Sequence, residues 1–122
     1  MSTQSYKDLI VWQKSIELVK IVYALTKQLP KEEVYGLTSQ MRRCAVSIPS
    51  NIAEGQKRNS ISEYVQFLYI ANYSAAELET QLIITREVYS NIDTLQCQEL
   101  LQEVQKMTST LIGKLKPKTS NL

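Results

Sequence analysis

Four polar side chains recur at helical spacing within residues 40–58, and they carry hydroxyl, amide and carboxyl groups. They are Gln40, Ser47, Asn51 and Glu54. An apolar row runs beside them at three- and four-residue steps, so the segment is predicted to form one amphipathic helix. A polar row next to a core-facing row is either an internal hydrogen-bond network or a binding surface, and both interpretations fit the spacing.

If this polar row is buried, its groups must be paired, because an unpaired buried carboxylate is costly. The candidate partners are arginines of the same segment and hydroxyls of the next predicted helix, such as Ser74. Pairing of this kind would fix the helix register and satisfy the backbone that Pro49 leaves without a hydrogen bond.

Basic side chains stand in two places where they could contact phosphate, whose geometry arginine forks match well. The first group is Arg42, Arg43, Lys57 and Arg58. The second group follows Glu103, the last acidic residue, and consists of Lys106, Lys114, Lys116 and Lys118. The alternatives are solvated or intersubunit salt bridges for the first group and cations favourably placed at a helix C-terminus for the second.

The amino-acid composition argues against several kinds of catalytic and metal chemistry. The chain has no histidine, so the usual proton carrier at neutral pH and the commonest metal ligand are missing. Cys44 and Cys97 lack metal-ligand spacing, and no phosphate-binding glycine loop occurs. A serine or cysteine nucleophile would lack its usual base. We therefore expect a protein that is not an enzyme and that uses no metal or cofactor.

The length and amino-acid composition favour a single globular domain over residues 1–122. Three glycines, three prolines and 43% apolar residues are typical of regular packed structure. The net charge of +2 permits contact with nucleic acid without indicating it. The two cysteines lie in apolar helical patterns, as expected for buried thiols of a cytoplasmic protein. No stretch approaches the ~18–20 apolar residues of a membrane span, so no membrane partner is expected.

Apolar periodicity predicts four helices and no strand. Long helices joined by short turns favour an all-α, up-down-up-down antiparallel four-helix bundle. The helices are predicted at about 8–29, 37–55, 60–89 and 93–116. The ends, residues 1–5 and 117–122, are expected to fray.

Local signals mark the expected helix ends. Ser60 opens a capping-box pattern at the third helix, and Asp93 is predicted to cap the fourth. Pro49 is expected to kink the second helix, and Gly55 to end it in the left-handed conformation. Pro117 is expected to end the fourth helix.

The first predicted helix carries two apolar stripes. One stripe consists of Leu9, Trp12, Ile16, Val19, Tyr23 and Thr26. The other consists of Val11, Leu18, Val22, Leu25 and Leu29. One side of a small bundle does not easily hide so many apolar residues, so we expect the second stripe to mediate association. The alternative is that it broadens the face packed into the bundle.

Several segments together resemble a known family. They are Leu9–Gln13, the turn Leu29–Leu37, the run Gln40–Gly55 with Arg58 beyond it, and Ser74–Gln81. The run Gln40–Gly55 is the most specific of these. On these segments the chain resembles the bacterial four-helix bundle proteins called 23S rRNA-intervening sequence proteins, which are similar to the accessory variability determinants of diversity-generating retroelements.

The resemblance implies a four-helix bundle that assembles into a ring-shaped homopentamer. It also implies association with RNA or DNA and contact with a protein partner such as a reverse transcriptase. The expected function is that of a non-enzymatic oligomeric scaffold associated with nucleic acid. The alternative is a protein-only adaptor ring that binds no nucleic acid.

Overall fold

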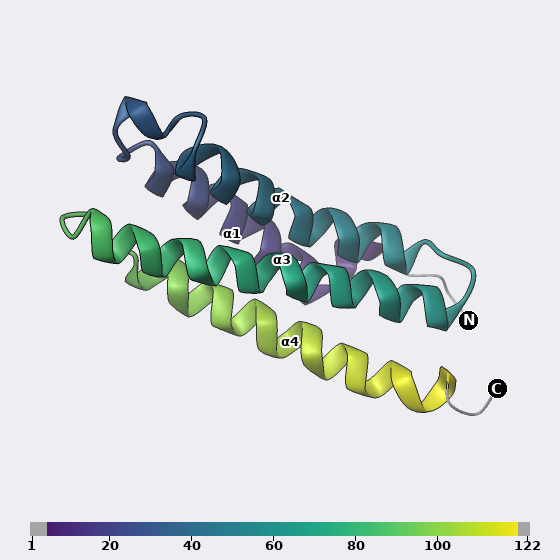
Figure 1. Ribbon diagram of the computed structural model, residues 1–122. Helices are drawn as coiled ribbons and strands as arrows, with labels where there is room; N and C mark the ends of the chain where they lie inside the picture. The colour runs from purple at the N-terminus through teal and green to yellow at the C-terminus, as the bar shows by residue number, and fades with distance from the viewer. Residues whose placement is uncertain (1–4, 120–122) are drawn as a thin grey trace.

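Four helices form the protein, and the chain reverses direction at each connection between them (Figure 1). The computed structural model describes residues 5–119, with side chains described as far as Pro117. The helices are α1 (Ile10–Thr26), α2 (Leu37–Gln56), α3 (Ile61–Val88) and α4 (Leu95–Thr119), with short 3-10 turns at Tyr6–Asp8 and Lys31–Glu33. No strand occurs among the described residues. The all-α four-helix bundle is confirmed.

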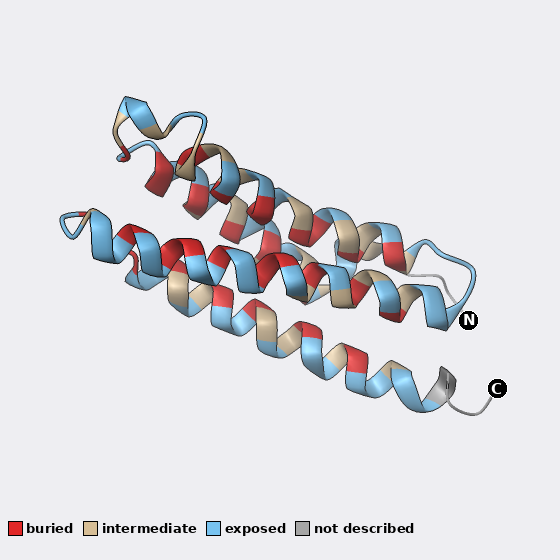
Figure 2. Cartoon of the chain, viewed as in Figure 1, coloured by how far each residue is buried: buried red, intermediate tan, exposed pale blue. Residues whose placement is uncertain are grey.

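Each helix packs against two others, so the four helices surround one core. α2 and α4 each contact both α1 and α3, which places α1 and α3 at opposite corners of the bundle. Leu18, Met41, Leu78 and Leu101, one from each helix, are almost completely buried. Figure 2 shows the buried residues on the inward faces of the helices and exposed residues on the outward faces.

The second stripe of α1 lies in this core, so the prediction that it mediates association is wrong. Leu18 and Val22 are fully buried, and Val11 and Leu25 are nearly so. The neighbouring helices α2 and α4 cover this stripe, which the spacing of α1 alone could not reveal. The exposed apolar side chains of α1 are Ile10, which belongs to neither stripe, and Ile16 and Tyr23 of the other stripe, which are 36% and 39% exposed.

Two predicted helix caps form as expected. The Glu63 amide donates to the Ser60 hydroxyl over 3.1 Å at the start of α3. The Leu95 amide donates to the Asp93 carboxylate over 3.0 Å at the start of α4. Both caps satisfy amide groups that the first helical turn leaves without partners.

Gly55 does not end α2 in the left-handed conformation, because no described glycine has a positive φ. It lies inside α2 and is buried. A Cβ atom built on Gly55 would stand 2.7 Å from the Phe67 Cβ and 3.2 Å from the Tyr64 carbonyl oxygen of α3. A glycine is therefore needed for the close approach of two helices, and not for a turn.

The prolines do not end the helices that contain them. α2 continues through Pro49, and α4 continues through Pro117 to Thr119. Proline has a helical φ and removes only one hydrogen bond, so a helix can pass through it. Residues 117–119 belong to α4, and Ser5 caps a 3-10 turn through the Lys7 amide. The fraying of the two ends of the chain stays a prediction. Residues 1–4 and 120–122 lie outside the described residues.

α1 is shorter than predicted. It begins at Ile10 and ends at Thr26, whereas the prediction runs over about 8–29. Asp8 belongs to the preceding 3-10 turn, and Leu29 follows in the turn before Pro30. No helix in the described part of the chain is long and apolar enough to cross a membrane.

Candidate functional site

One residue of the predicted polar row, Ser47, joins α2 to α3, and a second, Asn51, is bonded to it. The hydroxyl groups of Ser47 and Ser74 lie 2.8 Å apart and share a hydrogen bond. The Asn51 side-chain amide donates to the Ser47 carbonyl over 2.8 Å and to its hydroxyl over 2.9 Å. These three residues, the polar seam, satisfy one another and fix the two helices side by side.

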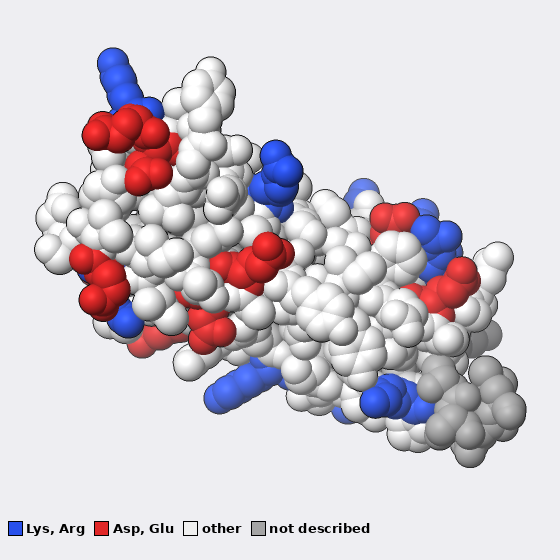
Figure 3. Space-filling model, viewed as in Figure 1, with Lys and Arg blue, Asp and Glu red and all other residues white. Residues whose placement is uncertain are grey.

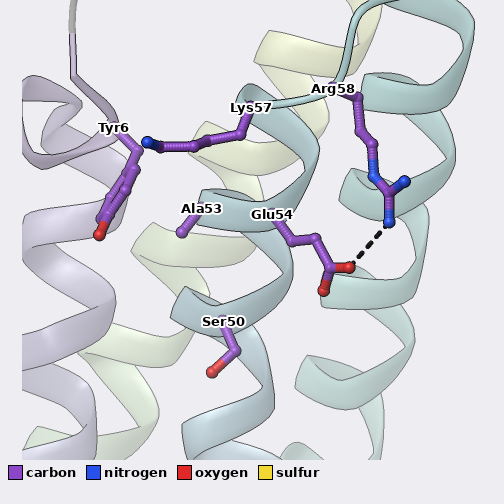
Figure 4. Close-up of a pocket in the computed structure, with 6 residues that line it drawn as sticks. All are labelled: Tyr6, Ser50, Ala53, Glu54, Lys57 and Arg58. Atoms are coloured by element: carbon purple, nitrogen blue, oxygen red, sulfur yellow. Dashed lines mark hydrogen bonds and ion pairs between the residues drawn. The ribbon is translucent and has the colours of Figure 1, made fainter.

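The other two residues of the row face solvent. Gln40 is exposed on the surface of α2. Glu54 forms a 2.8 Å ion pair with Arg58, four residues further along the chain (Figure 4). Both partners of this pair are largely exposed, so its contribution to stability is small. Within the predicted polar row, Ser47 and Asn51 therefore lie in the polar seam, whereas Gln40 and Glu54 face solvent.

A hollow of about 430 Å³ opens beside the polar seam, between α2 and α3. Arg43 and Glu77 stand on its walls with opposite charges. At its buried side the Gln81 amide nitrogen lies 3.5 Å from the Cys44 sulfur. The Gln81 side-chain oxygen has no hydrogen-bond partner in the described part of the chain, although Gln81 is only 8% exposed.

This hollow offers hydrogen bonds and little reactivity. Burial raises the pKa of the Cys44 thiol, so the thiol stays protonated and is a poor nucleophile. Burial likewise raises the pKa of Cys97 to about 12. Both cysteines are free and buried, as predicted. No group of three or more histidine, cysteine or acidic residues able to hold a metal occurs among the residues described.

The unpaired Gln81 oxygen leads to a prediction about stability. Replacing Gln81 with methionine is expected to raise the free energy of unfolding by roughly 1 kcal/mol, since an unsatisfied buried polar group costs about that much or more. Urea unfolding of both proteins would measure the difference. Ser74→Ala is the comparison, and it is expected to lower the same free energy by about 1 kcal/mol because it breaks the polar seam. A loss of stability in Gln81→Met would contradict the prediction.

Two of the predicted phosphate-binding arginines make contacts within the bundle. Arg42 donates to the Thr26 hydroxyl over 2.9 Å and lies 4.4 Å from the centre of the Tyr23 ring, so it joins α2 to α1. Arg58 lies 4.7 Å from the centre of the Phe67 ring, in addition to its pairing with Glu54. These contacts hold both guanidinium groups against side chains of neighbouring helices.

The remaining basic residues are more accessible. Arg43 and Lys57 are exposed. Lys57 lines a second hollow of about 530 Å³, beside Tyr6 and Ser50 (Figure 4). Lys114 is exposed on α4, and the Lys116 ammonium lies 5.9 Å from the centre of the Tyr69 ring. The side chain of Lys118 lies outside those that the structure describes.

Comparison with known proteins identifies the family. Residues 7–113 match the family model described as 23S rRNA-intervening sequence protein. The chain belongs to this family. No match was found among curated proteins.

A solved structure similar to this 23S rRNA-intervening sequence protein shows the same fold. It is the crystal structure of a protein with unknown function from the S23 ribosomal protein family of Bacteroides thetaiotaomicron. The two proteins are 24% identical and superpose with a TM-score of 0.75, covering 84% of this chain and 98% of the other.

One interaction in this family member escaped prediction from the sequence. The Tyr89 hydroxyl donates to the Glu33 carboxylate over 2.5 Å, which connects the turn before α2 to the end of α3. Together with the Leu37 amide, this bond lowers the pKa of Glu33, and it raises the pKa of Tyr89 to about 12. In the sequence, the only sign of this interaction is that Glu33 stands just before a helix, where the helix dipole favours a negative charge.

Proposed function

We propose that the protein is a non-enzymatic scaffold that assembles into a homo-oligomer. The observation that carries this proposal is an apolar stripe on the solvent side of α3, the outer stripe. Its residues are Ile70, Tyr73, Ile84 and Val88, which are 41%, 63%, 43% and 62% exposed. Exposed apolar side chains gathered on one side of a helix are typical of a site of protein association.

Helical geometry places the outer stripe on one side of α3, beside the residues that pack into the core. The steps of three and four residues between its members, with Glu77 and Thr80 in the gap, keep them on one side of α3. In Figure 3 the surface over α3 combines uncharged areas with acidic side chains. This side of the helix stays partly exposed in the monomer and is therefore available to a second copy.

The contents of the polar hollow support a non-enzymatic role. The Ser47 and Ser74 hydroxyl groups in it bond to each other, the Cys44 thiol is protonated, and its two charged residues stand on the walls. General acid–base or nucleophilic catalysis needs an activated group beside a reactive one. The described lining of the hollow offers a rigid hydrogen-bonding surface instead.

The proposed assembly is a ring of five, which the family resemblance suggests. Gel filtration coupled to light scattering would test assembly on the intact chain at micromolar concentration. We expect a mass several times the 14.0 kDa of one chain. A clean monomer under these conditions would contradict the proposal.

A second candidate function is association with RNA or DNA, favoured by the lysines that follow Glu103 without an intervening acid. We expect weak binding that falls steeply with salt, because phosphate contacts release counterions. Changing Lys114, Lys116 and Lys118 to glutamine should reduce the slope of log K against log salt by about 2–3. Fluorescence anisotropy with labelled single-stranded RNA would measure both effects. No binding at low salt, or an unchanged slope, would contradict this function.

The alternative is a ring that binds protein partners alone. Acidic side chains are interspersed with basic ones in the view of Figure 3, which favours this alternative over a dedicated nucleic-acid surface. A reverse transcriptase is the partner that the resemblance suggests. Retention of such a partner at high salt, with no nucleic acid in the complex, would favour the adaptor.

A further inference from the structure

A second apolar surface, the α1–α4 groove, lies between the start of α1 and the second half of α4. It has a volume of about 370 Å³, and Leu9, Met107 and Leu111 line it as partly buried side chains. Lys106 and Lys114 also line the groove. Neither lysine has an ion-pair partner among the described residues.

The α1–α4 groove and α3 carry opposite charge. The second half of α4 has no acid after Glu103, and Asp8 is the single acid in the lining of the groove. α3 instead carries four acids against one base. These residues are Glu63, Glu77, Glu79 and Glu87, with Arg86 as the base.

Glu77 lies within the span of the outer stripe, between Tyr73 and Ile84. It is exposed and stands on the wall of the polar hollow rather than in an ion pair of the described chain. Its position therefore gives the apolar outer stripe a central negative charge. A partner that covers this stripe well needs apolar side chains with lysine or arginine beside them.

We propose that the outer stripe of one copy docks into the α1–α4 groove of a second copy. This inference rests on the proposed homo-oligomer and identifies its interface. In the contact, Tyr73 and Ile84 cover the apolar floor of the groove, while Lys106 and Lys114 approach Glu77. Both surfaces are unpaired in the single chain, and each supplies the apolar area and the charge that the other needs.

The two surfaces lie on different sides of the bundle. The outer stripe faces away from the core at α3, whereas the groove involves α1 and α4, and α1 occupies the corner opposite α3. One copy can therefore engage two neighbours at once, one through each surface. A heterologous contact of this kind builds a ring when its rotation closes.

Two variants test this interface, one for each surface. The groove variant carries Lys106→Glu and Lys114→Glu, and the stripe variant carries Tyr73→Glu and Ile84→Glu. A matched control, Lys27→Glu with Lys31→Glu, makes the same change of charge at exposed positions in the connection between α1 and α2. Circular dichroism would verify that each variant stays helical.

The decisive experiment measures the mass of each variant alone and of an equimolar mixture by sedimentation velocity. We expect the concentration needed for assembly to rise at least ~10-fold for both variants. In the groove variant the new glutamates face Glu77 of the neighbour, so like charges meet. In the stripe variant carboxylates replace the apolar side chains that would cover the floor of the groove, and burying them there is costly. The control should keep the mass of the wild type. The mixture should form a dimer of one chain of each variant, because one intact groove then meets one intact stripe.

Each other outcome has a defined meaning. A groove variant that assembles like the wild type would overturn the proposed interface while leaving the oligomer intact. Two monomeric variants that do not combine would overturn it as well. A monomeric wild type would instead overturn the proposed oligomer itself. If a variant loses helicity, Lys106→Gln with Lys114→Gln and Tyr73→Ser with Ile84→Ser repeat the same comparison.

Discussion

Replacing Gly55 with alanine is expected to lower the free energy of unfolding by ~1–3 kcal/mol, although alanine is the better helix former. The new methyl group would lie 2.7 Å from the Phe67 Cβ and 3.2 Å from the Tyr64 carbonyl oxygen. Neither atom is the end of a flexible side chain, so α2 and α3 must move apart. Urea unfolding, monitored by circular dichroism, would measure the loss.

Gly113 provides the matched control for this substitution. It lies in α4, and a Cβ atom there would meet nothing within 4 Å. Gly113→Ala should therefore raise the free energy of unfolding by ~0.5–1 kcal/mol through helix propensity alone. Equal effects of the two substitutions would show that Gly55 is not required for helix packing.

The second large effect concerns two residues of the same helix, one in the core and one on the surface. Leu78 is fully buried, whereas Ile84 is 43% exposed on the outer stripe. Leu78→Ala is expected to lower the free energy of unfolding by ~2–5 kcal/mol, because it leaves a cavity in the core. Ile84→Ala should change it by less than ~0.5 kcal/mol, as surface substitutions usually do.

The two substitutions should rank in the reverse order in their effect on assembly. Ile84→Ala removes apolar area from the outer stripe and should weaken the oligomer, whereas Leu78→Ala leaves that surface unchanged. Light scattering would compare the masses, and unfolding would be measured at a concentration low enough to dissociate the oligomer, since assembly itself stabilises the fold. An Ile84→Ala protein that assembles as well as the wild type would remove the outer stripe from the interface.

Interactions between near neighbours in the chain could be predicted from the sequence. The caps at Ser60 and Asp93 depend on amides within three residues, and the pairing of Glu54 with Arg58 spans one helical turn. Such contacts follow from helix geometry, which the apolar periodicity already indicates. The bundle itself follows from four amphipathic helices with short connections.

Features that depend on a second helix could not be assigned. The spacing in α1 gives two stripes, but the packing of α2 and α4 determines that Leu18 and Val22 are inside. The role of Gly55 depends on Phe67, which lies beyond the next turn. The Ser74 hydroxyl was a candidate partner for the polar row, yet its bond to Ser47, and the unpaired Gln81 beside it, require the register of α2 against α3.

The proposal of a closed homo-oligomer is tested most directly by native mass spectrometry of the intact protein over a range of concentrations. We predict a single assembly of five chains, each of 14.0 kDa, that does not grow as the concentration rises. That result would require every copy to contact its neighbours in one closed assembly. A monomer at every concentration, or a ladder of ever larger species, would contradict it.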